Sequence, residues 1–93
     1  MLYVYILYSE ANDRIYIGHT DNLEARLDRH NRGMVRSTKA YSPWNLIHSE
    51  DFSSRGEAMK REKVLKSHKG RDFIRKNMLK WQGPADDGLS AID

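Results

Sequence analysis

A tyrosine, an arginine and a histidine lie close together between Tyr16 and His30. The guanidinium of Arg26 has a planar fork of donors that matches phosphate oxygens. Tyr16 and His30 carry groups that can transfer protons. Gly18 follows the tyrosine where a short apolar strand gives way to a helix, and we expect it to shape the space around the site. The stretch suits the handling of a phosphate but contains no metal ligand.

Glu62 is the best candidate for that ligand, since it lies between Met59 and Leu65 on the expected inner side of a helix. A buried carboxylate without a partner is costly, so Glu62 needs a cation, a hydrogen-bond network or water. Two interpretations stay open. Glu62 pairs with a cation such as Arg26 and ties two helices together, or it binds a hard divalent ion such as Mg²⁺. With Tyr5 as a further proton-transfer group, the second interpretation suits phosphodiester hydrolysis.

The elements that must position these residues begin with a hairpin. Residues 2–8 are apolar or aromatic on both faces, which predicts a strand covered on both sides. Residues 14–20 predict a second strand after a polar turn. If the turn centres near Glu10-Ala11, Tyr5 and Tyr16 become cross-strand neighbours on one face of the sheet. Residues 44–52 predict a third strand.

The first helix follows Asp21 and Glu24, which resemble a capping box. Arg26 and His30 share one face of this helix, together with two leucines, and this face should pack on the sheet. Gly33 is the predicted stop. Residues 34–43 predict a basic, mobile loop.

Two more helices are predicted in the second half of the chain. Ser54 and Glu57 form a capping box for a helix that runs to about residue 67, with an inner stripe of Ala58, Met59, Glu62 and Leu65. A third helix after Gly70 should turn four apolar side chains inward: Phe73, Ile74, Met78 and Trp81. We expect one domain over residues 1–81 and a C-terminal tail over residues 82–93.

The charge of the chain is uneven, although its net value is only +3. Between residues 55 and 80 the acidic residues are Glu57, Glu62 and Asp72, against a larger basic group of Arg55, Lys60, Arg61, Lys63, Lys66, Lys69, Arg71, Arg75, Lys76 and Lys80. Such a block favours nucleic acid as a partner, although a solvated helix face has the same composition. The candidate nucleic-acid contacts are Arg36, Lys39, Lys60, Lys63, Lys66, Lys69 and Arg71.

Several other classes of site are absent from the sequence. The chain has no cysteine, so it has no thiolate nucleophile and no cysteine-based zinc site. It has no Gly-x-Ser-x-Gly turn and no P-loop. His19, His48 and His68 show no metal-ligand spacing, and we assign them no role in the site. No segment resembles a signal peptide or a membrane span, so we expect a cytoplasmic protein without a membrane partner.

The positions of these residues are similar to those of the GIY-YIG nuclease superfamily. Tyr3-Val4-Tyr5 and Tyr16-Ile17-Gly18 resemble its paired signature, with Tyr3 in place of the first glycine. Arg26, His30 and Glu62 follow in the order of the family's arginine, its histidine or tyrosine, and its metal-binding glutamate. The resemblance covers about residues 1–80. It is closest to small stand-alone bacterial members related to the N-terminal nuclease domain of UvrC.

The resemblance implies an α/β protein of the α+β type, with a three-stranded antiparallel sheet flanked by about three helices, in agreement with the predicted order of elements. It also implies one Mg²⁺ or Mn²⁺ on Glu62 and attack by water on DNA, with repair or processing of branched DNA as the expected process. Tyr16 acts as general base in the usual assignment, Tyr5 assists, and Arg26 contacts the phosphate. Such a site requires these three side chains and Glu62 to converge on one face. Asn77 is the nearest candidate for an asparagine that some members use.

Two other functions stay open from the sequence. The same fold and basic surface suit a nucleic-acid-binding module with little or no turnover. A protein-interaction domain or homodimer that uses Trp44 or Trp81 is the third alternative. The sequence leaves the oligomeric state, and a partner protein or domain that supplies targeting, undetermined.

Overall fold

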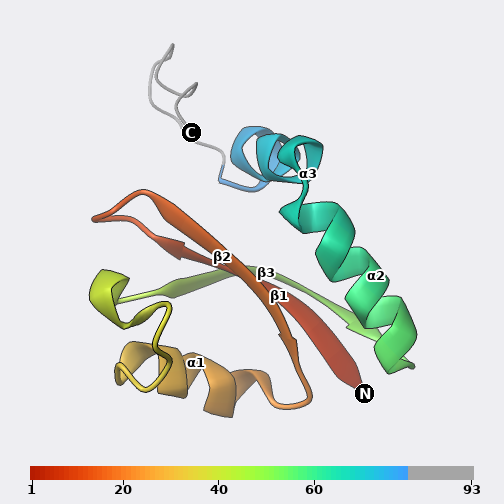
Figure 1. Ribbon diagram of the computed structural model, residues 1–93, viewed down its shortest axis with the longest axis horizontal. Coiled ribbons are helices and arrows are strands. Elements are labelled where there is room, and N and C mark those ends of the chain that lie inside the picture. Colours follow the sequence, from red (N-terminus) through yellow and green to blue (C-terminus); the bar gives the residue numbers. More distant parts are fainter. Residues whose placement is uncertain (80–93) are drawn as a thin grey trace.

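A three-stranded antiparallel sheet in the order β2-β1-β3 forms the centre of the fold (Figure 1). The computed structural model describes residues 1–79. β1 spans Leu2–Ser9, β2 spans Arg14–Thr20 and β3 spans Asn45–Phe52. The central strand β1 is apolar on both faces because helices or loops cover both, as its sequence predicted. The predicted α+β fold, with helices flanking this sheet, is confirmed.

The hairpin between β1 and β2 has a register two residues away from the expected one. Tyr5 pairs with Gly18, and Leu7 pairs with Tyr16. The assumed turn centre near Glu10-Ala11 was wrong, because the turn centres later in the chain, with Asp13 in the left-handed region at φ 53°. A shift of two residues keeps side chains on the same face. Tyr5 and Tyr16 are therefore diagonal neighbours on one face of the sheet.

Helix α1, Leu23–Asn31, begins one residue later than its capping signal suggested. Asn22 rather than Asp21 is the N-cap, and its side-chain oxygen accepts a hydrogen bond from the Ala25 N–H at 3.1 Å. The predicted stop, Gly33, follows the C-cap Arg32 and has a φ of +74°. Its N–H donates to the His30 carbonyl, and the next N–H donates to the Arg29 carbonyl. This pair of bonds is the Schellman motif, which favours glycine.

Helix α2, Arg55–Lys66, has the predicted cap, since the Ser54 hydroxyl accepts from the Glu57 N–H. Ala58 and Leu65 are buried, but Met59 is 52% exposed, so its place on the inner stripe was wrong. Arg61 turns toward the sheet instead, because its guanidinium donates two hydrogen bonds to Glu50 on β3, at 2.7 and 3.0 Å.

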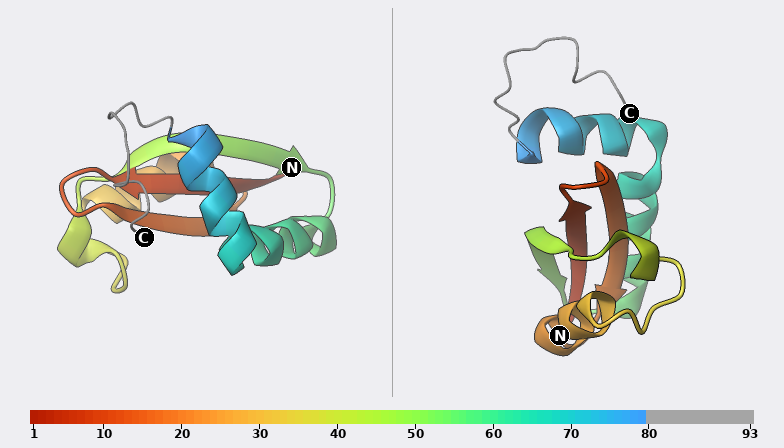
Figure 2. Two further views of the ribbon diagram at one scale, coloured as in Figure 1. Left: turned by 90° about the horizontal axis from the view of Figure 1, so that it is seen from above. Right: turned by 90° about the vertical axis from the view of Figure 1, so that its left-hand side faces the viewer.

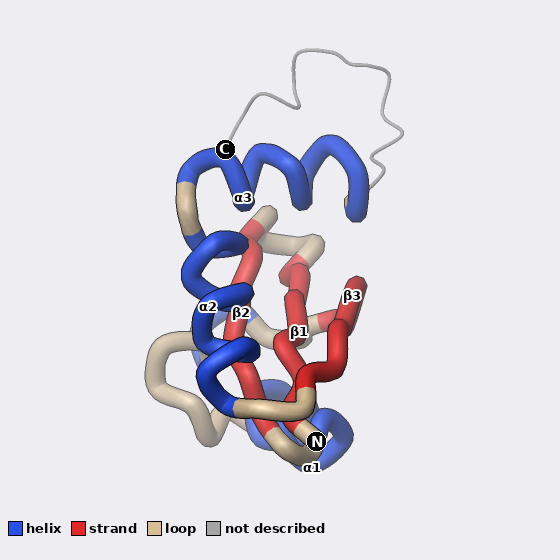
Figure 3. The backbone as a smooth tube through the Cα atoms, turned by 90° about the vertical axis from the view of Figure 1, so that its right-hand side faces the viewer, coloured by secondary structure: helices blue, strands red, loops and turns tan. Residues whose placement is uncertain are grey.

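Helix α3, His68–Phe73, continues into a π-helical turn, Ile74–Met78 (η2). Gly70 lies inside α3, where a Cβ would overlap the carbonyl oxygens of Val64 and Leu65, so this glycine lets α3 pack against the end of α2 (Figure 3). Ile74 is buried as predicted, whereas Phe73 is 46% exposed. The predictions for Trp81 and for a tail over residues 82–93 lie outside the described residues.

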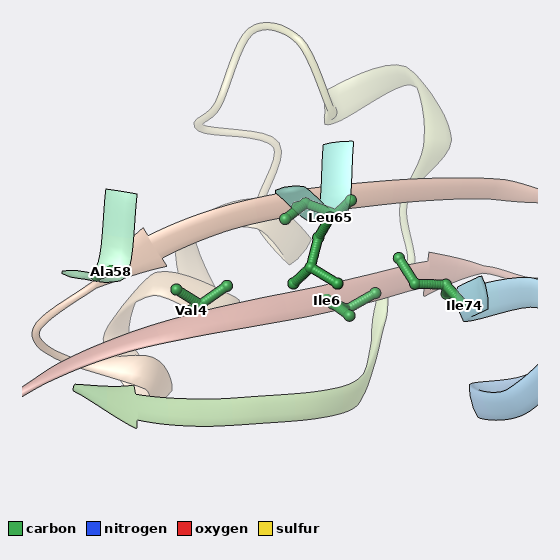
Figure 4. Packing of buried hydrophobic residues seen from close by; sticks show 6 residues of the cluster. Val4, Ile6, Ala58, Leu65 and Ile74 are labelled. Atoms are coloured by element: carbon green, nitrogen blue, oxygen red, sulfur yellow. The ribbon is translucent and has the colours of Figure 1, made fainter. Parts of the chain in front are cut away.

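Helix α1 lies on one side of the sheet and α2 and α3 lie on the other (Figure 2), and an apolar cluster fills each face. The face toward α2 and α3 holds six buried residues: Val4, Ile6, Ile17, Ala58, Leu65 and Ile74 (Figure 4). The face toward α1 is more aromatic, with Tyr5, Leu7 and Trp44 buried and Tyr16, Leu23, Leu27 and Tyr41 packed around them. The loop before β3 includes the short 3-10 helix η1, Lys39–Tyr41, which belongs to this second layer. Two of the candidate site residues, Tyr5 and Tyr16, therefore lie on the face toward α1.

Candidate active site

Tyr5, Tyr16 and His30 form an aromatic cluster between the sheet and α1. The ring centroids of Tyr5 and Tyr16 are 6.2 Å apart, and those of Tyr16 and His30 are 4.8 Å apart. The hydroxyl of Tyr5 lies 3.0 Å from Nε2 of His30. The stripe on α1 faces the sheet as predicted, with His30 fully buried. Three of the predicted site residues, Tyr5, Tyr16 and His30, are thus brought together.

Gly18 makes room for this cluster. It is the cross-strand partner of Tyr5, and the Tyr5 ring lies across it. A Cβ on residue 18 would be 2.8 Å from the Tyr5 hydroxyl and 3.1 Å from a ring carbon of Tyr16. Both distances are shorter than an ordinary van der Waals contact. The absence of a side chain at Gly18 is what allows the two tyrosines to meet.

His30 is held between two hydroxyl groups. Its Nδ1 lies 2.8 Å from the Thr38 hydroxyl, and that hydroxyl is 3.4 Å from the Val35 carbonyl, to which it donates. The Thr38 oxygen then accepts the Nδ1–H, which leaves Nε2 to accept from Tyr5. Burial, assisted by the nearby cations Arg26 and Arg29, lowers the pKa of His30 to about 4. His30 is neutral at pH 7 and orients the Tyr5 hydroxyl.

Arg26 lies beside the Tyr5 hydroxyl and has no ion pair within residues 1–79. Its buried Nε has no hydrogen-bond partner there. The interaction with Tyr5 raises the pKa of Arg26. Burial raises the pKa of Tyr5, and the opposing influence of Arg26 does not cancel this effect. Tyr5 therefore keeps its proton at neutral pH, while the guanidinium remains available to an anion.

Glu62 does not share a face with Tyr5, Tyr16 and Arg26, so the expected convergence of these four side chains on one face was wrong. It projects from α2, which covers the opposite side of the sheet (Figure 1). Its charge nevertheless contributes to the raised pKa of Tyr5. Both side chains reach the edge strand β2, at neighbouring residues: Tyr5 lies over Gly18, and Glu62 contacts His19. The candidate site is therefore arranged around this edge.

The described partners of Glu62 are His19 and Lys66, so the suggested pairing with Arg26 is not formed. His19 Nδ1 lies 2.5 Å from Oε1, and Lys66 Nζ lies 2.7 Å from Oε2. Burial disfavours the charged form of Glu62, but these two hydrogen bonds keep its pKa below the usual value. Glu62 is a carboxylate at neutral pH.

His19 is the residue that the sequence prediction missed. Strand alternation contains the signal, because Tyr16 and Gly18 on one face place Ile17 and His19 on the other. That other face is the one that α2 covers. Metal-ligand spacing along the chain could not reveal the contact, since it joins residues 43 positions apart.

The Glu62 carboxylate supplies the oxygen donors among these contacts, so a divalent ion held there would keep most of its water. Within the described part of the chain no group of three or more histidine, cysteine, aspartate or glutamate side chains is arranged to hold a metal. A single carboxylate, completed by water and substrate phosphate, is a common arrangement for Mg²⁺. The ammonium group of Lys66 already places a positive charge on one Glu62 oxygen. Glu62 would hold such an ion in the position that the Lys66 ammonium now occupies.

The remaining predicted site residues lie on the surface. Asn77 is exposed, and its side-chain amide donates to the Phe73 carbonyl of the same helical segment, so its contacts do not link it to the tyrosines or to Glu62. The seven basic residues predicted to contact nucleic acid are all exposed: Arg36, Lys39, Lys60, Lys63, Lys66, Lys69 and Arg71. None of the helices within residues 1–79 has the length and apolar character needed to cross a membrane. A cytoplasmic location stays a prediction.

Comparison with known proteins identifies the family. The family model described as the GIY-YIG catalytic domain matches residues 1–77. UPF0213 protein SH2523 of Staphylococcus haemolyticus is 42% identical over 79 residues, which cover 84% of this chain and 89% of that protein. UPF0213 protein NP_0776A of Natronomonas pharaonis is 41% identical over 66 residues, which cover 70% and 76%.

A solved structure agrees with the fold. The solution NMR structure of UPF0213 protein BH0048 from Bacillus halodurans matches with a TM-score of 0.51 at 29% identity, and the match covers 90% of this chain and 89% of that one. The chain belongs to the GIY-YIG family of catalytic domains and has its nuclease-type fold.

Proposed function

We propose that this protein is a metal-dependent endonuclease that hydrolyses phosphodiester bonds in DNA. The observation that carries the proposal is Arg26, a cation without an ion pair in the described structure, next to the hydroxyl of Tyr5. A partly buried guanidinium of this kind favours an anionic ligand, and its planar fork matches a phosphate. Branched DNA that arises in repair is the substrate class we propose.

The residues of the site divide the chemistry between them. Arg26 binds the scissile phosphate and stabilises the charge that develops on it. Tyr5 has a raised pKa and stays protonated; its one proton is donated to neutral His30, so Tyr5 positions the guanidinium of Arg26 through its hydroxyl oxygen and does not bind the phosphate itself. This leaves the half-buried Tyr16 as the candidate that accepts the proton of the attacking water.

Glu62 holds the divalent ion in this proposal, and GIY-YIG nucleases in general depend on such ions. Mg²⁺ or Mn²⁺ bound there would lower the pKa of a water molecule and neutralise phosphate charge. The exposed lysines of α2 lie on the same helix as Glu62, and we propose that they bind the DNA backbone. Binding of this type contributes affinity without sequence recognition.

The test is cleavage of supercoiled plasmid and of branched oligonucleotides with Mg²⁺ or Mn²⁺. We expect metal-dependent cleavage by the wild type and a loss of at least about 100-fold in Glu62→Ala. Glu57→Ala is the matched control, since it removes an exposed carboxylate from the same helix. Cleavage that persists unchanged in Glu62→Ala would overturn the proposed metal site.

The second candidate function is a nucleic-acid-binding module without robust turnover. It is favoured by the contacts of Glu62, whose charge is already compensated by the Lys66 ammonium and whose other oxygen already accepts a hydrogen bond from His19. Both functions give an affinity that falls steeply with salt. Only cleavage separates them, so tight, salt-dependent binding without cleavage of any tested DNA would select the binding module.

A further inference from the structure

The two carboxylate oxygens of Glu62 are held in different ways. Oε1 accepts a hydrogen bond from His19 on β2, a residue far away in sequence. Oε2 contacts Lys66, one turn further along the same helix. The side chains of His19 and Glu62 are only 24% and 16% exposed, whereas that of Lys66 is 48% exposed. The contact to Oε1 is therefore fixed by the fold, and the contact to Oε2 is open to exchange.

The direction of the His19 hydrogen bond follows from its other partner. Arg55 NH1 lies 3.2 Å from His19 Nε2, and a guanidinium only donates. Nε2 is therefore the acceptor nitrogen of a neutral imidazole, and the proton is on Nδ1. His19 donates this proton to Oε1 of Glu62. Arg55, at the start of α2, thus selects the tautomer that His19 needs.

We propose that His19 is a positioning residue for the metal ligand. His19 would hold Oε1 and leave Oε2 available to a divalent ion, which would take the place of the Lys66 ammonium. This inference rests on the proposed function, because it takes Glu62 as the ligand. Hydrogen-bond donors that orient a ligating carboxylate commonly govern metal affinity. His19 and Lys66 then have opposite effects on that affinity.

The test measures Mn²⁺ affinity without DNA, from the loss of the electron paramagnetic resonance signal of free Mn²⁺. We expect His19→Ala to weaken binding about 10-fold, the lower end of the range for such donors. His19→Asn should restore most of it, because the asparagine amide nitrogen can occupy the position of Nδ1 and donate to Oε1. His68→Ala, which removes an exposed histidine from α3, should leave the affinity unchanged.

Lys66 provides the test of opposite sign. Lys66→Gln removes the cation that competes at Oε2, so we expect Mn²⁺ to bind about fivefold more tightly. Lys63→Gln removes a neighbouring exposed charge from the same helix and is the matched control. Thermal unfolding of each variant without metal shows whether the protein is folded.

Three outcomes contradict the inference, and they are distinguishable. Equal Mn²⁺ affinity of folded His19→Ala and wild type shows that His19 does not position the ligand. An equal loss in His19→Ala and His19→Asn indicates direct ligation by the imidazole instead. If Glu62→Ala binds Mn²⁺ as tightly as the wild type, Glu62 is not the ligand, and the metal site of the proposed function fails as well.

Discussion

Replacing Gly18 with alanine should show whether the stability gained by a strand residue with a side chain outweighs the loss of the space that the Tyr5 side chain occupies. Glycine weakens strands, so a methyl group there would normally stabilise the protein by about 0.5–1 kcal/mol. In this structure the added Cβ would be 2.8 Å from the Tyr5 hydroxyl and 3.0 Å from the ring carbon that bears it. Restoring an ordinary contact requires a shift of roughly 0.5 Å or more.

The Tyr5 side chain cannot make this shift freely. Its hydroxyl is bonded to buried His30, and its ring packs against Tyr16. Overpacking of this kind costs about 1–3 kcal/mol. For a domain of this size we expect the melting temperature of Gly18→Ala to fall by about 5–15 °C. Because the two tyrosines are also displaced, metal-dependent cleavage should slow by about 10- to 100-fold.

The assay is thermal unfolding followed by circular dichroism, together with cleavage under single-turnover conditions. Gly56→Ala is the matched control, since a Cβ there meets no atom within 4 Å. It lies in the first turn of α2, so the control should gain about 0.5 kcal/mol. A Gly18→Ala protein as stable and as active as Gly56→Ala would refute the steric reasoning.

Three further perturbations test other parts of the structure. The pKa of His30 is about 4 in the folded protein and 6.5 when unperturbed, so the unfolded chain binds more protons between these values. The free energy of unfolding should therefore fall by roughly 3 kcal/mol as the pH drops from 6.5 to 4. The measurement is the urea midpoint of wild type and His30→Gln as a function of pH. Parallel pH profiles of the two proteins would contradict this assignment. Arg26→Lys should keep its stability but lose about 100-fold in cleavage, because an ammonium cannot bind phosphate bidentately, and a wild-type rate would contradict this role. Arg61→Ala removes the two hydrogen bonds to Glu50 that join α2 to β3. A urea titration should show a free energy of unfolding lower by about 1 kcal/mol. Unchanged stability would show that this pair does not hold α2 on the sheet.

The sequence was sufficient to predict the elements and most of the residues around Tyr5. Period-two alternation defined β1 and β2, and the helical stripe placed Arg26 and His30 toward the sheet. Ser54 and Gly33 marked helix ends through hydrogen bonds to nearby residues. These features are local, so they are readable from short stretches of sequence.

What the sequence did not reveal depends on contacts between distant segments. The hairpin register follows from the turn, where Asp13 is held by Tyr8 and Arg75. The α2 stripe is rotated because Arg61 finds Glu50 on β3, which exposes Met59. The partners of Glu62 follow from which face of the sheet α2 covers. Periodicity within one helix contains none of this information.

The position of Glu62 on the opposite side of the sheet makes the edge of β2 the essential part of the proposed site. Tyr5 crosses this edge over Gly18, and Glu62 approaches it through His19. An arrangement of this kind requires that Arg26 and Glu62 act on the same phosphate, although they belong to different layers of the fold. If they act as one unit, their mutational effects are not independent.

A double-mutant cycle on Arg26→Lys and Glu62→Gln therefore tests the central claim most directly. The measurement is the single-turnover rate of Mn²⁺-dependent cleavage of one branched DNA by wild type, both single variants and the double variant. If the two residues form one site, the double variant should be scarcely slower than the slower single variant. Losses that multiply fully, or a Glu62→Gln protein that cleaves at the wild-type rate, would contradict a single site at the edge of β2.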